Sequence, residues 1–157
     1  MSSLINTRKI LLADDDKDDQ ILFQEVLDEL PLVTHLSTVL NGEQLMLLLH
    51  ETKELPDILF LDLNMPRKNG FACLSEVKRT EKLKGLPVVV FSTSYDANVV
   101  DILYKNGAQF YIRKPNNFVV LKNIIHKALL LTEPGDISQS AKEQFVLSRQ
   151  FSDDEKK

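Results

Sequence analysis

The sequence predicts an α/β fold, a doubly wound parallel sheet in which five strands alternate with five helices. Two observations support this prediction. Five short apolar runs of strand length recur along the 157 residues, and three of them are apolar at nearly every position, as in parallel strands that are buried on both faces. Stretches with helical periodicity separate the runs, and parallel neighbours require such helical returns.

The first part of the chain supplies two complete strand–helix units and a third strand. The run KILLA at 9–13 is the first predicted strand, and apolar residues recur every three or four positions over 18–30, which predicts a helix. HLSTVL at 35–40 is the second strand, and 43–51 repeats the helical pattern. DILFLDL at 57–63 is apolar almost throughout, as expected of a central strand.

The second part of the chain completes the alternation. The helical pattern returns at 71–83, and PVVVFST at 87–93 is the fourth predicted strand. A helix over 97–106 leads to the fifth strand, QFYIR at 109–113, and the fifth helix covers 117–131. We therefore expect a sheet with helices on both faces, whose ligand site lies at the carboxyl ends of the strands.

Composition excludes several classes of function. The net charge of -4 gives no general attraction to nucleic acid or to an anionic membrane surface, so neither is expected as a partner. The lone cysteine, Cys73, cannot form an internal disulfide and is expected to be a buried apolar side chain. The N-terminal apolar run is too short for a signal peptide or a membrane span, which favours a cytoplasmic location.

Polar residues follow the predicted strands at the point where each strand ends. Asp14 and Asp15 follow the first strand, Asp62 ends the third, Ser92 the fourth, and Lys114 follows the fifth. Carboxylates that converge from different strands form a hard oxygen cluster suited to Mg²⁺. The sequence therefore predicts a magnesium site at this edge of the sheet.

Capping is the competing explanation for the aspartates that follow the first strand. Asp16, Asp18 and Asp19 are assigned to helix capping and to a solvated face, and on their own Asp14 and Asp15 fit that role equally well. Asp62 is different, because a proline and turn residues separate it from the next helix. A buried carboxylate needs a metal or a cationic partner, and Lys114 offers the second.

These groups permit phosphoryl transfer. A carboxylate can attack phosphorus and form an acyl phosphate, while Mg²⁺ and a lysine neutralise the phosphoryl oxygens and a hydroxyl completes their shell. The chain has neither a G-x-x-x-x-G-K-[ST] loop nor a G-x-G-x-x-G turn after the first strand, so no bound nucleotide is expected. A small phosphoryl donor or another protein is expected to supply the group.

The motifs LLADDD, LFLDLNMPRKNGF, PVVVFSTS and NGAQFYIRKP, in this order, resemble the receiver domain of two-component response regulators over residues 8–131. The resemblance implies a flavodoxin-like (βα)5 sheet with strand order 2-1-3-4-5. It also implies roles for single residues, which are Asp62 as phosphoacceptor, Asp14 and Asp15 as metal ligands with Asp15 the more direct, the Asn64 backbone carbonyl as a further ligand, and Ser92, Lys114 and Tyr111 as switch residues.

Three details of the resemblance stay open. Ser92 is chosen by strand register, and a shift of one residue would select Thr93. Tyr111 matches the aromatic position that swings inward in the family, but it fits an ordinary sheet-edge aromatic equally well. The Lys114–Pro115 peptide is expected to be cis, as it commonly is in the family.

The resemblance also implies the partners. A sensor histidine kinase or a phosphotransfer protein would phosphorylate Asp62, and the face formed by the fourth helix, fifth strand and fifth helix would bind a downstream protein. The chain is then a stand-alone signalling switch of the chemotaxis or bacteriophytochrome-associated kind, not an enzyme beyond its own phosphorylation. A homodimer through this face, motivated by Val99, Phe110 and Tyr111, is a further hypothesis.

Residues 132–157 are expected to form a tail outside the domain. One amphipathic helix over 138–151 is predicted from Ala141, Phe145, Val146 and Leu147, followed by six charged, disordered residues. A tail of this length is too short for a DNA-binding or enzymatic output domain.

Two alternative functions use the same residues. A Mg²⁺-dependent phosphatase of the haloacid dehalogenase group would need an acid two residues after its nucleophile, where Asn64 stands, and also a cap domain. A scaffold that works without phosphorylation would typically have lost an acid or the lysine, and both are present here. The response regulator is therefore the favoured interpretation.

Overall fold

The computed structural model describes residues 7–147 and contains one parallel sheet in the order β2-β1-β3-β4-β5-β6. The elements are β1 (Arg8–Ala13), α1 (Lys17–Glu29), β2 (Thr34–Val39), α2 (Gly42–Glu51), β3 (Ile58–Leu61), α3 (Gly70–Arg79), β4 (Val88–Ser92), α4 (Ala97–Lys105), β5 (Phe110–Arg113), α5 (Phe118–Leu131), the short 3₁₀ helix η2 (Lys142–Gln144) and β6 (Val146–Leu147). The predicted doubly wound α/β fold is confirmed, with one strand more than expected.

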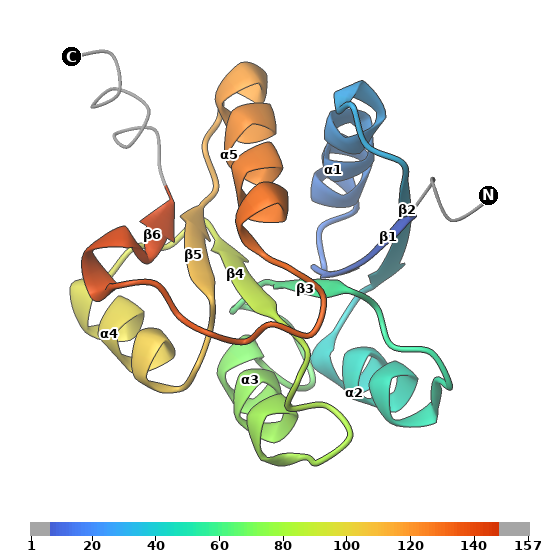
Figure 1. Cartoon of the computed structure of the whole chain (residues 1–157), viewed down its shortest axis with the longest axis vertical. Coiled ribbons are helices and arrows are strands. Elements are labelled where there is room, and N and C mark those ends of the chain that lie inside the picture. The colour runs from blue at the N-terminus through green and yellow to red at the C-terminus, as the bar shows by residue number, and fades with distance from the viewer. Residues whose placement is uncertain (1–6, 148–157) are drawn as a thin grey trace.

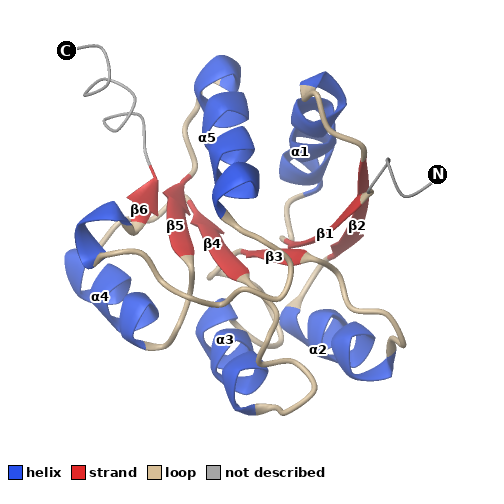
Figure 2. Cartoon of the chain, in the orientation of Figure 1, coloured by secondary structure: helices blue, strands red, loops and turns tan. Residues whose placement is uncertain are grey.

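The helices cover both faces of the sheet. Figures 1 and 2 show α1 and α5 on one face and α2, α3 and α4 on the other. The strand residues alternate between two buried clusters, because successive side chains of a strand point to opposite faces. In β3, Ile58 and Phe60 pack in the cluster with α1 and α5, whereas Leu59 and Leu61 pack in the cluster with α2, α3 and α4.

The helices begin where an Asp or Asn can bind their free amides. Asp16, Asn41, Asn69, Asp96 and Asn117 are the N-caps of α1 to α5, and each side chain accepts a hydrogen bond from a backbone amide in the first turn. Each cap follows a strand after a few residues. The strand ends and the helix starts therefore gather at one edge of the sheet, where the polar residues predicted from the sequence lie.

The chain after α5 differs from the prediction. The helix expected over 138–151 is wrong for the described part, because residues 142–144 form η2 and Val146–Leu147 form β6, parallel to β5. Alternation within β6 explains the difference: Val146 packs against the cluster with α4, and Leu147 packs in the cluster with α5. A strand places two successive residues on opposite faces of the sheet, whereas the predicted amphipathic helix would have put Val146 and Leu147 on one apolar face. The predicted disordered end lies outside the described residues.

Two smaller expectations are corrected. Helix α3 ends at Arg79, not at residue 83, since Thr80 leaves the helical conformation and residues 80–86 form turns. The Lys114–Pro115 peptide is trans, not cis; both forms are accessible to a proline peptide because they differ little in energy.

Cys73 is fully buried, and burial raises the pKa of its thiol to about 11. This environment agrees with the predicted role as an apolar core residue. Within residues 7–147, the helices are all too short or too polar to cross a membrane.

Candidate functional site

Three carboxylates meet at the carboxyl edge of the sheet. Asp14 follows β1 and Asp62 follows β3, the two neighbouring strands between which the strand order reverses, and Asp15 stands beside them. One carboxylate oxygen from each lies within 4.8 Å of the others. Asp14 and Asp62 are buried while Asp15 is exposed, so the cluster is open to solvent on one side.

The buried acids hold their protons more tightly than free aspartates do. Burial raises the pKa of Asp14 to about 6, although Lys114 and the Asp16 amide oppose the shift. Burial also raises the pKa of Asp62, again against the effect of Lys114. Two buried carboxylates and one exposed carboxylate on the same small surface form the hard, anionic oxygen set that a divalent cation such as Mg²⁺ fits.

Lys114 is the cation that the cluster already contains. Its Nζ lies 2.8 Å from Asp14 Oδ2, 2.8 Å from Asp19 Oδ2 and 3.7 Å from Asp62 Oδ2. Burial works to lower the pKa of this amine, but the hydrogen bonds with Asp14 and Asp19 outweigh it, so that the net shift is upward. The backbone amide of Lys114 also donates to the Ser92 carbonyl, 2.8 Å away, which ties the end of β5 to the end of β4.

Asp19 is the site residue that sequence reasoning missed. The sequence assigns it to helix capping and a solvated face, yet its carboxylate, in the first turn of α1, binds Lys114 as closely as Asp14 does. Its neighbour Asp18 is exposed, as predicted, and Asp16 is the N-cap. Only its position could have indicated this role. Helix α1 starts just after β1 ends, so the first turn of the helix lies close to the carboxylate cluster at the strand ends.

Ser92 and Tyr111 lie beside the cluster on β4 and β5. Ser92 is fully buried at the last position of β4, whereas Thr93 is exposed, and the strand therefore ends at the residue that the predicted register selected. The Tyr111 side chain is also fully buried, and its hydroxyl donates to the backbone carbonyl of Ser94. Burial raises the pKa of the Tyr111 phenol.

Tyr111 is not a sheet-edge aromatic, because β6 lies outside β5. The same finding weakens the motive for the predicted homodimer. Phe110 and Tyr111 are core residues and Val99 is half-buried, so these three do not form an exposed apolar face.

The loop after Asp62 is held close to the acid. The amide of Asn64 donates to Asp62 Oδ1 at 3.4 Å, and the Asn64 residue itself is exposed. Gly70 begins α3 against this loop, and a Cβ at this position would lie only 2.4 Å from the Asp62 carbonyl oxygen. A glycine is therefore required for α3 to start so near the site.

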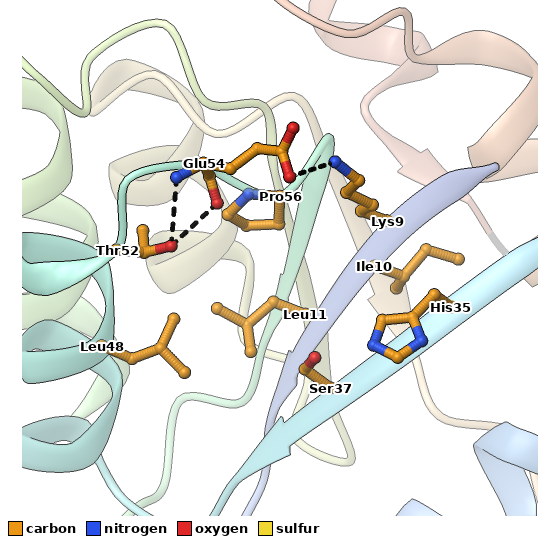
Figure 3. A pocket seen from close by; sticks show the side chains of 9 residues that line it. All are labelled: Lys9, Ile10, Leu11, His35, Ser37, Leu48, Thr52, Glu54 and Pro56. Atoms are coloured by element: carbon orange, nitrogen blue, oxygen red, sulfur yellow. Dashed lines mark hydrogen bonds and ion pairs between the residues drawn. The ribbon is translucent and has the colours of Figure 1, made fainter. Parts of the chain in front are cut away.

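A separate surface pocket of about 400 Å³ lies between β1, β2 and the end of α2 (Figure 3). Lys9 and Glu54 form a 2.6 Å ion pair across it, and His35 and Ser37 line it from β2. Lys9 lies near the start of β1, whereas the acid cluster follows the end of that strand. The pocket and the carboxylate cluster are therefore distinct places on the molecule.

Comparison with known proteins gives consistent results. A family model described as "Response regulator receiver domain" matches residues 10–126. The chain is 35% identical over 113 residues to the response regulator Rcp1 of Synechocystis sp. (strain ATCC 27184 / PCC 6803 / Kazusa), a match that covers 69% of this chain and 77% of Rcp1.

Solved structures show the same similarity in three dimensions. The phosphorylated cyanobacterial phytochrome response regulator RcpA is 34% identical with a TM-score of 0.73, and the match covers 78% of this chain and 91% of RcpA. The Mn²⁺-bound form of the response regulator Rcp1 is 31% identical with a TM-score of 0.72, and the match covers 79% and 93% of the two chains.

Proposed function

The chain belongs to the response regulator receiver family, a family of two-component signalling proteins, and from this premise we propose that Asp62 accepts a phosphoryl group in a Mg²⁺-dependent reaction. One observation carries the proposal: the Asp62 carboxylate is buried at the end of β3 and lies within reach of Asp14, Asp15 and the Lys114 amine. The phosphorylated form of RcpA is a solved structure, and RcpA is similar to this chain.

In the proposed step, an oxygen of the Asp62 carboxylate forms a bond to phosphorus while the bond from phosphorus to the donor's leaving group breaks. The electron pair of the broken bond stays with the leaving group, which is the imidazole of a phosphohistidine in a kinase or phosphotransfer protein. Lys114 binds a phosphoryl oxygen, and the Ser92 hydroxyl donates to another. The chain thus needs no general base, because its nucleophile is already an anion when Asp62 is ionised.

Asp14, Asp15, Asp62 and the Asn64 carbonyl would hold the metal, with the exposed Asp15 as the most accessible ligand. When bound, Mg²⁺ neutralises part of the charge on the transferred phosphoryl group. The Mn²⁺-bound form of Rcp1 supports a divalent cation in a similar protein. The assignment of Mg²⁺ to this chain rests on its all-oxygen donor set.

The output is proposed to be binding of another protein, not turnover of a substrate. Phosphorylation would give Ser92 and Lys114 a new anionic partner and so shift the equilibrium between two arrangements of α4, β5 and α5. Tyr111 supports this link, since its hydroxyl binds the loop that directly follows Ser92. The domain boundaries 8–131 and a cytoplasmic location remain predictions from the sequence.

Acetyl phosphate tests the proposal directly. The pure protein is incubated with acetyl phosphate and Mg²⁺, and intact-mass spectrometry measures the fraction that gains one phosphoryl group. The gain should disappear in the Asp62→Asn variant and in the presence of EDTA, while Asp57→Asn, an acid at the opposite end of β3, should behave as the wild type. A wild-type protein that binds Mg²⁺ but gains no mass would favour a scaffold that works without phosphorylation.

A further inference from the structure

Residues 136–147, here called the tail segment, occupy a defined seat on the domain. The seat consists of the edge of β5 that pairs with β6, the side chains of Asp101 and Tyr104 on α4, and Gln109 just before β5. Figure 1 shows β6 beside β5 and near α4, well away from the end of α5 to which the segment is joined. The face that was expected to bind a downstream partner is thus partly covered by the chain itself.

Three hydrogen bonds of the seat recognise the backbone of the tail segment. The Gln109 side chain donates to the Ile137 carbonyl at 2.7 Å, the Tyr104 hydroxyl donates to the Ser140 carbonyl at 2.8 Å, and the Tyr111 amide donates to the Phe145 carbonyl at 3.0 Å. Every extended peptide offers such carbonyls. These three donors therefore suit the backbone of any segment that adds a parallel strand to β5.

Side chains of the tail segment add selectivity. The Gln139 side-chain amide donates to the backbone carbonyls of Tyr104 and Ala108 at 2.8 and 2.6 Å. The Phe145 ring is buried against Tyr104 in an edge-on arrangement with centroids 5.2 Å apart, and Leu147 is buried on the other face of the sheet. Lys142 forms an ion pair with Asp101. The seat is therefore selective for a basic residue followed, three and five positions later, by an aromatic and an aliphatic residue.

The joint between α5 and the tail segment would let the segment leave without unfolding the domain. Residues 133–139 are exposed, and Gly135 has a φ of +80°, so the chain turns away from α5 in a short solvent-exposed connection. Outside the segment, β5 remains paired with β4 through four residues. Loss of the segment would expose the seat while the rest of the sheet stays intact.

We propose that this seat is a docking site for an extended segment of a partner protein, with a basic, an aromatic and an aliphatic residue in the spacing of Lys142, Phe145 and Leu147, and that the tail segment is its intramolecular competitor. The inference deepens the proposed protein-binding function and rests on it. The tail segment shows the chemistry that fits, because it is seated there itself.

The experiment uses the full chain and a fluorescein-labelled peptide with the sequence of residues 137–147, ISQSAKEQFVL. Phe145→Ala weakens the seated segment, and Gln144→Ala, an exposed neighbour, is the matched control. Hydrogen exchange at the Tyr111 amide reports whether the segment is seated, since that amide donates to Phe145. We expect the exchange rate to rise about tenfold or more in Phe145→Ala but not in the Gln144→Ala control. The peptide should likewise bind Phe145→Ala but not the control.

The Lys142→Glu variant guards against a Phe145→Ala protein that fails to fold. Lys142 is exposed, so reversing its charge leaves the core intact. Peptide binding should rise in Lys142→Glu, because the ion pair with Asp101 is lost, and adding Asp101→Lys to the same chain should reverse that rise. Equal peptide binding by the Phe145→Ala and Gln144→Ala variants would overturn the proposal. A wild-type dimer in light scattering that disappears in Phe145→Ala would also overturn it, because the seat would then be occupied by the tail segment of a second copy of the chain. All these measurements use unphosphorylated protein, so that their failure is distinguishable from a failure of Asp62 phosphorylation.

Discussion

Replacement of Asp19 with asparagine tests whether this carboxylate draws Lys114 away from Asp62. The lysine Nζ lies 2.8 Å from Asp19 and 3.7 Å from Asp62. With an effective dielectric constant of about 20, Coulomb's law gives about 6 kcal/mol for the shorter pair and about 4.5 kcal/mol for the longer. The difference of about 1.5 kcal/mol favours Asp19, and solvent screening of this partly exposed residue reduces it to about 1 kcal/mol.

A preference of about 1 kcal/mol corresponds to about a fivefold change in an equilibrium constant. We therefore expect Asp19→Asn to be phosphorylated by acetyl phosphate about fivefold faster, since Lys114 is then free to meet the incoming phosphoryl oxygens and one negative charge near the site is gone. The assay is the time course of mass gain at fixed Mg²⁺ and ionic strength.

Asp18→Asn is the matched control. It removes the same charge at the neighbouring position, and the Asp18 side chain is exposed, whereas Asp19 is the residue that pairs with Lys114. Asp19→Glu should retain most of the wild-type rate if the longer acid still reaches the amine. A readout without metal completes the test: Asp19→Asn should lower the thermal midpoint of the metal-free protein more than Asp18→Asn does. Equal rates and equal midpoints for the two asparagine variants would refute the reasoning.

Four further predictions concern other groups of the domain. Asp15→Ala should abolish Mg²⁺ binding in isothermal titration calorimetry without loss of stability, because Asp15 is exposed; unchanged affinity would exclude it as a ligand. Lys114→Ala should still be phosphorylated, more slowly, but should lose the phosphorylation-dependent change in partner binding, and a retained change would contradict this role. Tyr111→Phe should lower the free energy of unfolding by about 1 kcal/mol, measured in urea, through loss of the buried hydroxyl's bond to the Ser94 carbonyl. Burial lowers the pKa of Lys78 to about 8, so between pH 8 and 10 the unfolded chain binds more protons than the folded one. The free energy of unfolding of the wild type should therefore rise with pH in this range relative to that of Lys78→Met. The same pH dependence in both proteins would contradict the lowered pKa.

The fold was predictable because its main signals are local. Nearly continuous apolar runs such as ILFL at 58–61 identify strands buried on both faces, and the alternation with helices determines the parallel architecture. The convergence of Asp14, Asp62 and Lys114 followed from the same logic, since each directly follows a strand and the carboxyl ends of parallel strands share one edge.

The remaining features depend on contacts between distant parts of the chain. β6 is two residues long, and its place beside β5 depends on distant partners such as the Tyr111 amide, which donates to the Phe145 carbonyl. Residues 145–147 are all apolar, so that no period separates a helix from a strand over so short a run. Asp19 was missed for a similar reason: its partner Lys114 is 95 residues away in sequence, and an acid in the first turn of a helix ordinarily needs no partner beyond the helix amides.

Tyr111 belongs to two sets of interactions at once, so the proposed phosphorylation and the seating of the tail segment would be coupled in both directions. Its hydroxyl binds the loop after Ser92, and its amide binds the tail segment. By linkage, if phosphorylation weakens the binding of the tail segment to its seat by some factor, removal of the segment favours phosphorylation by the same factor. A partner that captures the β5 edge would then change how much phosphoryl group the protein retains at a given donor supply, so the receiver would report its downstream occupancy back to its own phosphorylation site.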